Sequence, residues 1–149
     1  MKTYDFARLQ ARPFPTVAEA RNPFIYGRVG VVVNVSQRDY PEELVQEFEK
    51  AGITFHHLPL VETGDDMGMD NILKAVGILE EADRAGKAAV VHCNFGNNRS
   101  RVVAEAFHFR KTGFQLEDEY KKSFNHLLYN CHRGLLPPPP VIEEILSGL

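Results

Sequence analysis

The chain has 149 residues, of which 44% are hydrophobic and 25% are charged, and its formal net charge is −3. This length suits one ordinary globular domain, so we expect a single domain over residues 1–149. The composition excludes a mostly disordered chain, and the shortness of its apolar runs excludes a membrane-spanning helix. The acidic balance provides no basic surface, so we expect neither nucleic acid nor a membrane as a partner.

The two cysteines, Cys93 and Cys131, are too few for a disulfide scaffold. The first residues contain no apolar segment of the kind found in secretory signals, so we expect a cytoplasmic protein with reduced thiols. Neither cysteine belongs to a Cys-x-x-Cys pair, and His126 and His132 are not at ligand spacing. We therefore expect no metal and no other cofactor.

Taken in chain order, residues 1–27 contain three prolines and predict an irregular lead-in with a short helical turn at Val17–Arg21. Residues 28–35 are β-branched and almost continuously apolar, which is typical of a strand buried on both faces of a parallel sheet. Pro41 suits the first position of a helix, because its missing N–H has no partner there in any case. Two glutamates follow it, and Gly52 is expected to end this helix.

A second strand is predicted at residues 53–60, followed by a polar, acidic loop over residues 61–69. Asp70 is expected to cap the next helix, which ends at Gly86. Residues 88–91 predict a third buried strand, and this strand leads directly into the segment HCNFGNNRS.

Three more helices are predicted: one that ends near Gly113, one over residues 116–131, and a short terminal helix within residues 137–149 after a proline-rich link. Strands that alternate with helices indicate βαβ units. The predicted fold class is therefore α/β, with a small central, mostly parallel sheet flanked by helices. Functional residues of such sheets gather at the carboxyl ends of the strands, where the third strand delivers residues 92–100.

This segment has the residue types of an anion site. Cys93 ends a buried strand and Arg99 opens a helix, while Gly96 and the asparagines between them tolerate unusual backbone dihedral angles. The N–H groups of a short loop at a helix N-terminus can converge on one anion, and an arginine can hold two oxygens of a phosphate. The predicted phosphate-binding residues are Asn94, Phe95, Gly96, Asn97, Asn98 and Arg99.

The same environment favours a reactive cysteine at this position. A helix N-terminus and a neighbouring cation stabilise the thiolate of Cys93, and a thiolate beside a bound phosphate is arranged to attack phosphorus. Ser100 can donate a hydrogen bond to this thiolate. We expect His92 to orient the loop through backbone contacts rather than to transfer protons.

HCNFGNNRS resembles the His-Cys-x5-Arg-Ser/Thr signature of the cysteine-dependent protein tyrosine and dual-specificity phosphatases, and the small chain resembles the dual-specificity branch. The likeness extends to GVVVNVS at residues 30–36 and GITFHHLPL at residues 52–60, so about residues 26–136 fit the layout of that family. The resemblance implies a phosphocysteine intermediate on Cys93, phosphate binding by the loop and Arg99, and metal-free hydrolysis in two steps.

The resemblance leaves the general acid open. The family uses an aspartate in the loop before the penultimate helix, and here that loop contains Glu62, Asp65 and Asp66. Counting from the preceding strand points to Glu62, whereas counting back from the helix start points nearer Asp65, which is our first choice. The family more usually has a small residue at the position of Asn98. An asparagine there resembles the RNA 5′-triphosphatase branch, which often has this residue at that position. We also expect Asn34 to brace the phosphate loop from the neighbouring strand.

We therefore expect a protein-tyrosine-phosphatase-type hydrolase whose substrate is a phosphorylated protein or a small phosphomonoester. Phosphotyrosine is the expected target, and phosphoserine and phosphothreonine are left open. One alternative is an RNA 5′-triphosphatase of the same fold, which Asn98 favours and the net charge of −3 disfavours. Another is a phosphate-binding module without turnover, which the presence of both Cys93 and Arg99 disfavours.

Overall fold

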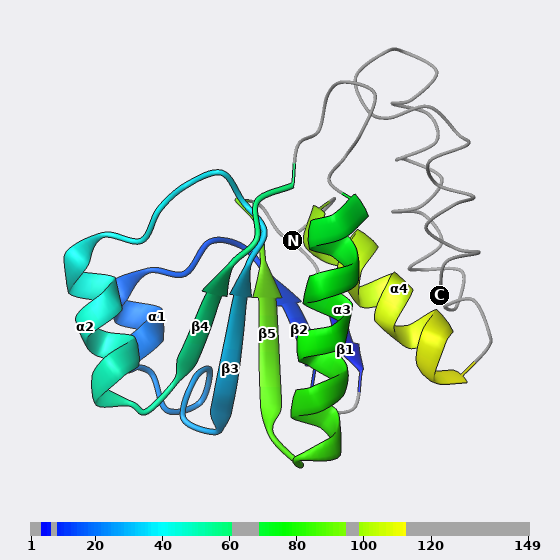
Figure 1. Ribbon diagram of the computed structural model, residues 1–149. Coiled ribbons are helices and arrows are strands. Elements are labelled where there is room, and N and C mark those ends of the chain that lie inside the picture. Colours follow the sequence, from blue (N-terminus) through cyan, green and yellow to red (C-terminus); the bar gives the residue numbers. More distant parts are fainter. Residues whose placement is uncertain (1–3, 7–8, 61–68, 95–98, 113–149) are drawn as a thin grey trace.

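The computed structural model describes residues 4–6, 9–60, 69–94 and 99–112. Within these ranges one sheet has the strand order β1-β2-β5-β3-β4, with helices beside it (Figure 1). The strands are β1 (Tyr4–Phe6), β2 (Leu9–Arg12), β3 (Val29–Asn34), β4 (Thr54–His57) and β5 (Ala88–His92). The helices are α1 (Val17–Arg21), α2 (Glu42–Lys50), α3 (Met69–Arg84) and α4 (Arg99–Thr112).

Parallel pairing dominates this sheet. Strand β5 lies between β2 and β3, and β3 also pairs with β4, in each case in the parallel sense. Only β1, which pairs with β2 at the edge, is antiparallel among the described strands. The predicted fold class, a small and mostly parallel sheet with flanking helices, is therefore confirmed.

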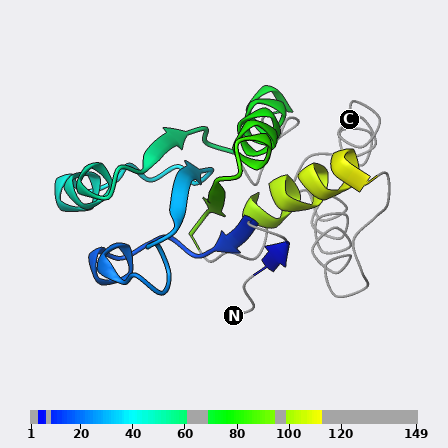
Figure 2. The same ribbon diagram turned by 90° about the horizontal axis from the view of Figure 1, so that it is seen from below.

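Alternate residues of the central strands contribute to two cores on opposite faces of the sheet. Val31 and Val33 of β3 belong to the core that contains the apolar residues of α3 and α4. Val32, between them, belongs to the other core, with Leu44 and Phe48 of α2. The view from below shows the same layers, with α1 and α2 on one side of the sheet and α3 and α4 on the other (Figure 2).

Two glycines end helices as predicted. Gly52 and Gly86 follow α2 and α3 with φ angles of 70° and 72°, in the left-handed region that favours glycine. The helix starts differ slightly from the prediction. Pro41 is the N-cap of α2 rather than its first residue. Asp70 lies inside the first turn of α3, which begins at Met69, so the prediction that Asp70 caps this helix was wrong.

The prediction of an irregular lead-in was wrong for the segment that contains β1 and β2. Strand β2 pairs with β5 from Leu9 opposite Ala89 to Arg12 opposite His92, so it occupies an inner position in the sheet. The sequence LQAR is short and alternating, without the β-branched run that identified β3 and β5. The predicted helix at α1 is confirmed, and reciprocal hydrogen bonds between Thr16 and Glu19 cap it.

Several predicted features lie outside the described residues: the acidic loop at 61–68, the loop centre at 95–98, the helix over 116–131 and the proline-rich link with its terminal helix at 137–149. In the described part of the chain, no helix combines the length and apolar character that crossing a membrane requires.

The aromatic cluster under α2 predicts a large stability effect. Phe48 is 0% exposed, and its ring packs against the rings of Tyr26, Tyr40 and Phe55. Because Phe48→Ala leaves a cavity there, it should lower the free energy of unfolding by about 3–5 kcal/mol in urea denaturation. The matched control is Phe24→Ala at a site that is 96% exposed, which should change stability by less than about 0.5 kcal/mol. Equal effects of the two variants would contradict this packing.

Candidate active site

The candidate site lies at the carboxyl end of β5. At this edge of the sheet, the segments that follow β3 and β5 lead to opposite faces. Strand β3 leads to α2 on one face of the sheet, whereas its neighbour β5 leads to α4 on the other face. In parallel sheets such a switch point is where ligands bind, because the two connections separate and leave room between them. The structure brings Cys93, Arg99 and Ser100 to this place.

Cys93 follows β5 directly, and its side chain is buried, at 3% exposure. Its Sγ lies 3.4 Å from the Oγ of Ser100, in the first turn of α4. A serine hydroxyl can donate a hydrogen bond to a thiolate, and the N-terminus of a helix favours negative charge. Both features stabilise the anionic form of the Cys93 sulfur.

Arg99 is the first residue of α4 and is 7% exposed. Its Nη1 donates a hydrogen bond to the carbonyl oxygen of Leu60, at 3.3 Å. Leu60 is buried after β4, immediately before the predicted acidic loop. An arginine guanidinium can hold two oxygens of a phosphate, so Arg99 is a candidate to bind an anionic group at this helix end.

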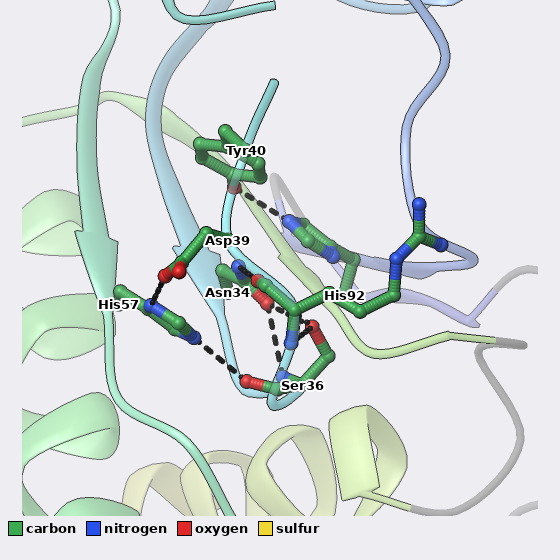
Figure 3. A network of polar contacts seen from close by, with 7 residues as sticks. Asn34, Ser36, Asp39, Tyr40, His57 and His92 are labelled. Carbon is green, nitrogen blue, oxygen red and sulfur yellow. Dashed lines mark hydrogen bonds and ion pairs between the residues drawn. The ribbon is translucent and has the colours of Figure 1, made fainter. Parts of the chain in front are cut away.

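His92 is a buried, neutral ring that contacts the backbone at the cysteine. Its Nδ1 lies 3.3 Å from the Cys93 carbonyl oxygen. Its Nε2 lies 2.6 Å from the Tyr40 hydroxyl (Figure 3). A carbonyl only accepts hydrogen bonds, so the proton is on Nδ1 and the Tyr40 hydroxyl donates to Nε2. Burial lowers the pKa of His92 to about 4, which keeps the ring uncharged at neutral pH.

Two aromatic residues that the sequence analysis did not single out complete this arrangement. Phe14 packs edge-on against the ring of His92, with 5.0 Å between centroids, and its backbone N–H donates to the carbonyl of Asn94 at 3.0 Å. Tyr40 comes from the segment after β3. The sequence could have indicated Phe14 and Tyr40 by their positions. Phe14 follows β2 and Tyr40 follows β3, and both strands end at the same edge of the sheet as β5.

Asn34 is a buried side chain that bonds to the turn after β3. Its Oδ1 accepts hydrogen bonds from the backbone N–H and the hydroxyl of Ser36, and its Nδ2 donates to the carbonyl of Arg38 at 2.8 Å (Figure 3). Residues 95–98 lie outside the described ranges, so the prediction that Asn34 braces the phosphate loop stays a prediction. Asparagine readily bonds to the backbone two to four residues ahead, and here that local interaction fixes the turn after β3.

His57, at the end of β4, holds the same turn from the other side. Its Nε2 donates to the carbonyl of Ser36 at 2.8 Å, and its Nδ1 lies 3.3 Å from an Asp39 carboxylate oxygen (Figure 3). Side chains from β3 and β4 thus immobilise the segment that delivers Tyr40 to His92.

The remaining predicted site residues lie outside the described ranges. These are Phe95, Gly96, Asn97 and Asn98 of the loop, and the candidate acids Glu62, Asp65 and Asp66. The structure therefore places the two ends of the predicted phosphate loop, Asn94 and Arg99. Within the described ranges, no three or more His, Cys, Asp or Glu side chains are grouped so as to hold a metal ion.

No family model matches the chain. Among solved structures, it is similar to Tk-PTP in the active form, with 20% identity, a TM-score of 0.64 and coverage of 97% of this chain and 92% of that one. It is similar to a putative phosphatase from Shewanella putrefaciens, with 14% identity, a TM-score of 0.68 and coverage of 97% and 85%. It is also similar to PTPMT1 in complex with PI(5)P, with 15% identity, a TM-score of 0.64 and coverage of 93% and 88%. The fold is therefore that of the protein-tyrosine-phosphatase-like proteins.

The buried His92 ring predicts a loss of stability in acid. Its pKa is about 4 in the folded protein, against an ordinary value of 6.5. As the pH falls below 6.5, the His92 ring of the unfolded chain binds a proton, whereas the ring of the folded chain stays neutral. The free energy of unfolding therefore declines until about pH 4. This ring should account for a loss on the order of 3 kcal/mol in urea denaturation across that range. His92→Gln should be less stable at pH 7 and show a correspondingly flatter pH dependence. Identical pH slopes for the two proteins would show that His92 titrates normally.

Proposed function

We propose that the chain is a phosphatase that hydrolyses phosphomonoesters through a phosphocysteine intermediate on Cys93. The observation that carries this proposal is the placement of the Cys93 sulfur, buried at the carboxyl end of β5 and 3.4 Å from the Ser100 hydroxyl. The buried Arg99 opens the helix that follows. A stabilised thiolate beside a cation and a helix N-terminus is suited to attack a bound phosphate.

In the first step, the substrate phosphate binds to the N–H groups of residues 94–98 and to the Arg99 guanidinium. The Cys93 sulfur attacks phosphorus, so that an S–P bond forms while the bond from phosphorus to the leaving oxygen breaks. An acid in the loop over residues 61–68 protonates that oxygen. Asp65 is our first candidate for this acid, and Asp66 and Glu62 are its rivals.

In the second step, water attacks phosphorus and the S–P bond breaks, which releases inorganic phosphate and restores the Cys93 thiolate. The acid of the first step, now a carboxylate, accepts the proton of the water. The Ser100 hydroxyl donates to the departing sulfur, and the distance of 3.4 Å supports this role. His92 holds the Cys93 carbonyl and, because it is neutral and buried, takes no part in proton transfer.

The proposed substrate is a phosphorylated protein, with phosphotyrosine as the preferred target in a dual-specificity-like enzyme, or a small phosphomonoester. The similar fold of PTPMT1, solved in complex with PI(5)P, supports phosphorylated small molecules as candidates. A thiolate nucleophile works only while it stays reduced, so we also propose a cytoplasmic location.

Cys93→Ser tests the nucleophile. We expect it to abolish hydrolysis of p-nitrophenyl phosphate while vanadate still binds, because the loop and Arg99 remain. Arg99→Lys should lower turnover severely, since lysine keeps the charge but loses the planar fork that holds two oxygens. The matched control is Arg84→Lys on the exposed end of α3, which should behave as wild type. A serine variant within about tenfold of the wild-type rate would overturn the proposed function.

The loop over residues 61–68 should supply the general acid. Aryl phosphates have good leaving groups and need little proton donation, whereas alkyl phosphates need more. One of Asp65→Asn, Asp66→Asn and Glu62→Gln should therefore slow alkyl phosphate hydrolysis by an additional factor on the order of 10²–10⁴. That variant should also remove the basic limb of the pH–rate profile. If the triple variant keeps the wild-type profile, this loop does not supply the acid, and a phosphoanhydride such as an RNA 5′-triphosphate becomes the better substrate to test.

A further inference from the structure

The turn after β3 presents an arginine, Arg38, whose backbone is fixed from several sides. The Arg38 N–H donates to the Ser36 Oγ at 3.2 Å, and the Arg38 carbonyl accepts from the Asn34 amide at 2.8 Å. Ser36 is held in turn by Asn34 and by the ring of His57 from β4 (Figure 3). The backbone of Arg38 is therefore held in a fixed position at the carboxyl edge of the sheet.

The Arg38 side chain is directed towards the residues that support Cys93. Its Cζ lies 3.9 Å from the centroid of the Phe14 ring, in a cation–π contact. Phe14 is itself bonded through its N–H to the carbonyl of Asn94, the residue after Cys93, and packs against His92. Burial is the main cause of the low pKa of His92, and the charge of Arg38 lowers this pKa further.

Arg38 forms no ion pair with any residue of the described ranges. The carboxylate beside it in the sequence, Asp39, is directed to His57 instead. Arg12, at the end of β2 on the same edge, is paired with Glu19 at 3.5 Å. Arg38 is also solvent-exposed. Its guanidinium is thus positioned by stacking while its charge has no carboxylate partner in the described part of the chain.

We propose that Arg38 binds a second anionic group of the substrate, next to the phosphomonoester that is cleaved at Cys93. This inference rests on the proposed function and specifies its substrate class: compounds that carry two phosphates, or a phosphate and a carboxylate, a short distance apart. A planar guanidinium matches two oxygens of such a group. Stacking on Phe14 holds that plane in place, so that less side-chain freedom is lost when the second group binds.

The test compares substrates that differ only in the second group. One pair is fructose 6-phosphate and fructose 1,6-bisphosphate, and the other is a phosphotyrosyl peptide with and without an adjacent second phosphotyrosine. The measured quantity is kcat/KM for the doubly charged substrate divided by that for its partner. Arg38→Gln should lower this ratio about tenfold in at least one pair, and Arg38→Lys should lower it less. High salt should also lower the wild-type ratio, because the guanidinium is exposed.

The matched control is Arg28→Gln, which removes an exposed arginine immediately before β3, at the opposite end of that strand from Arg38. This variant should keep the wild-type ratio. The pair that shows the Arg38-dependent preference identifies the source of the second group as a small molecule or a phosphoprotein. If Arg38 only stabilises the turn, Arg38→Gln lowers the urea midpoint and slows both members of each pair alike.

An unchanged ratio in both pairs overturns the role of Arg38, and the proposed function still stands if hydrolysis of the monophosphates depends on Cys93. The role of Arg38 is also overturned if the wild-type protein has no higher kcat/KM for the doubly charged substrate than for its partner in either pair. If no substrate of either pair is hydrolysed and p-nitrophenyl phosphate is also left intact, the proposed function fails and this inference fails with it.

Discussion

The buried imidazole of His92 is the interaction on which the candidate site depends. One ring nitrogen donates to the Cys93 carbonyl, and the other accepts from the Tyr40 hydroxyl. The ring satisfies both neighbours only in a single neutral tautomer, because a carbonyl cannot donate a hydrogen bond. Burial enforces that neutral state. The backbone at the cysteine is therefore fixed by an uncharged group, while Arg99 and the helix terminus contribute positive charge close to the Cys93 sulfur.

Around this ring, segments from neighbouring strands support one another. Phe14, after β2, bonds to the carbonyl of Asn94, while Asn34 and His57 fix the turn that delivers Tyr40. None of these contacts is strong alone, and each is worth about 1 kcal/mol. Together they make the edge of the sheet a rigid support before any ligand arrives. Such preorganisation is what an anion site needs, since binding then spends little free energy on ordering the protein.

The parts of the fold that local sequence pattern determines were predictable. Continuous β-branched runs identified β3 and β5, and left-handed glycines marked the ends of α2 and α3. Strand β2 was not predictable, because four alternating residues become a strand only by pairing with β5. At the site, the spacing from Cys93 to Ser100 indicated their proximity. The sequence did not indicate the contacts of Asn34, Phe14 and Tyr40. Each of these side chains has several possible partners, and the tertiary structure determines which of them lies within reach.

The inner position of β2 has a consequence for how the N-terminal segment can be handled. Residues 9–12 cover one side of β5, whose own sequence, AAVVH, is apolar and buried. Removal of the segment before Pro13 would turn β5 into an edge strand with a free row of N–H and C=O groups. Exposed apolar edges of this kind pair with other chains and aggregate. Residues 9–12 therefore act as a cover for the strand that leads to the cysteine, and a variant chain that keeps them should be less prone to aggregation than one that lacks them.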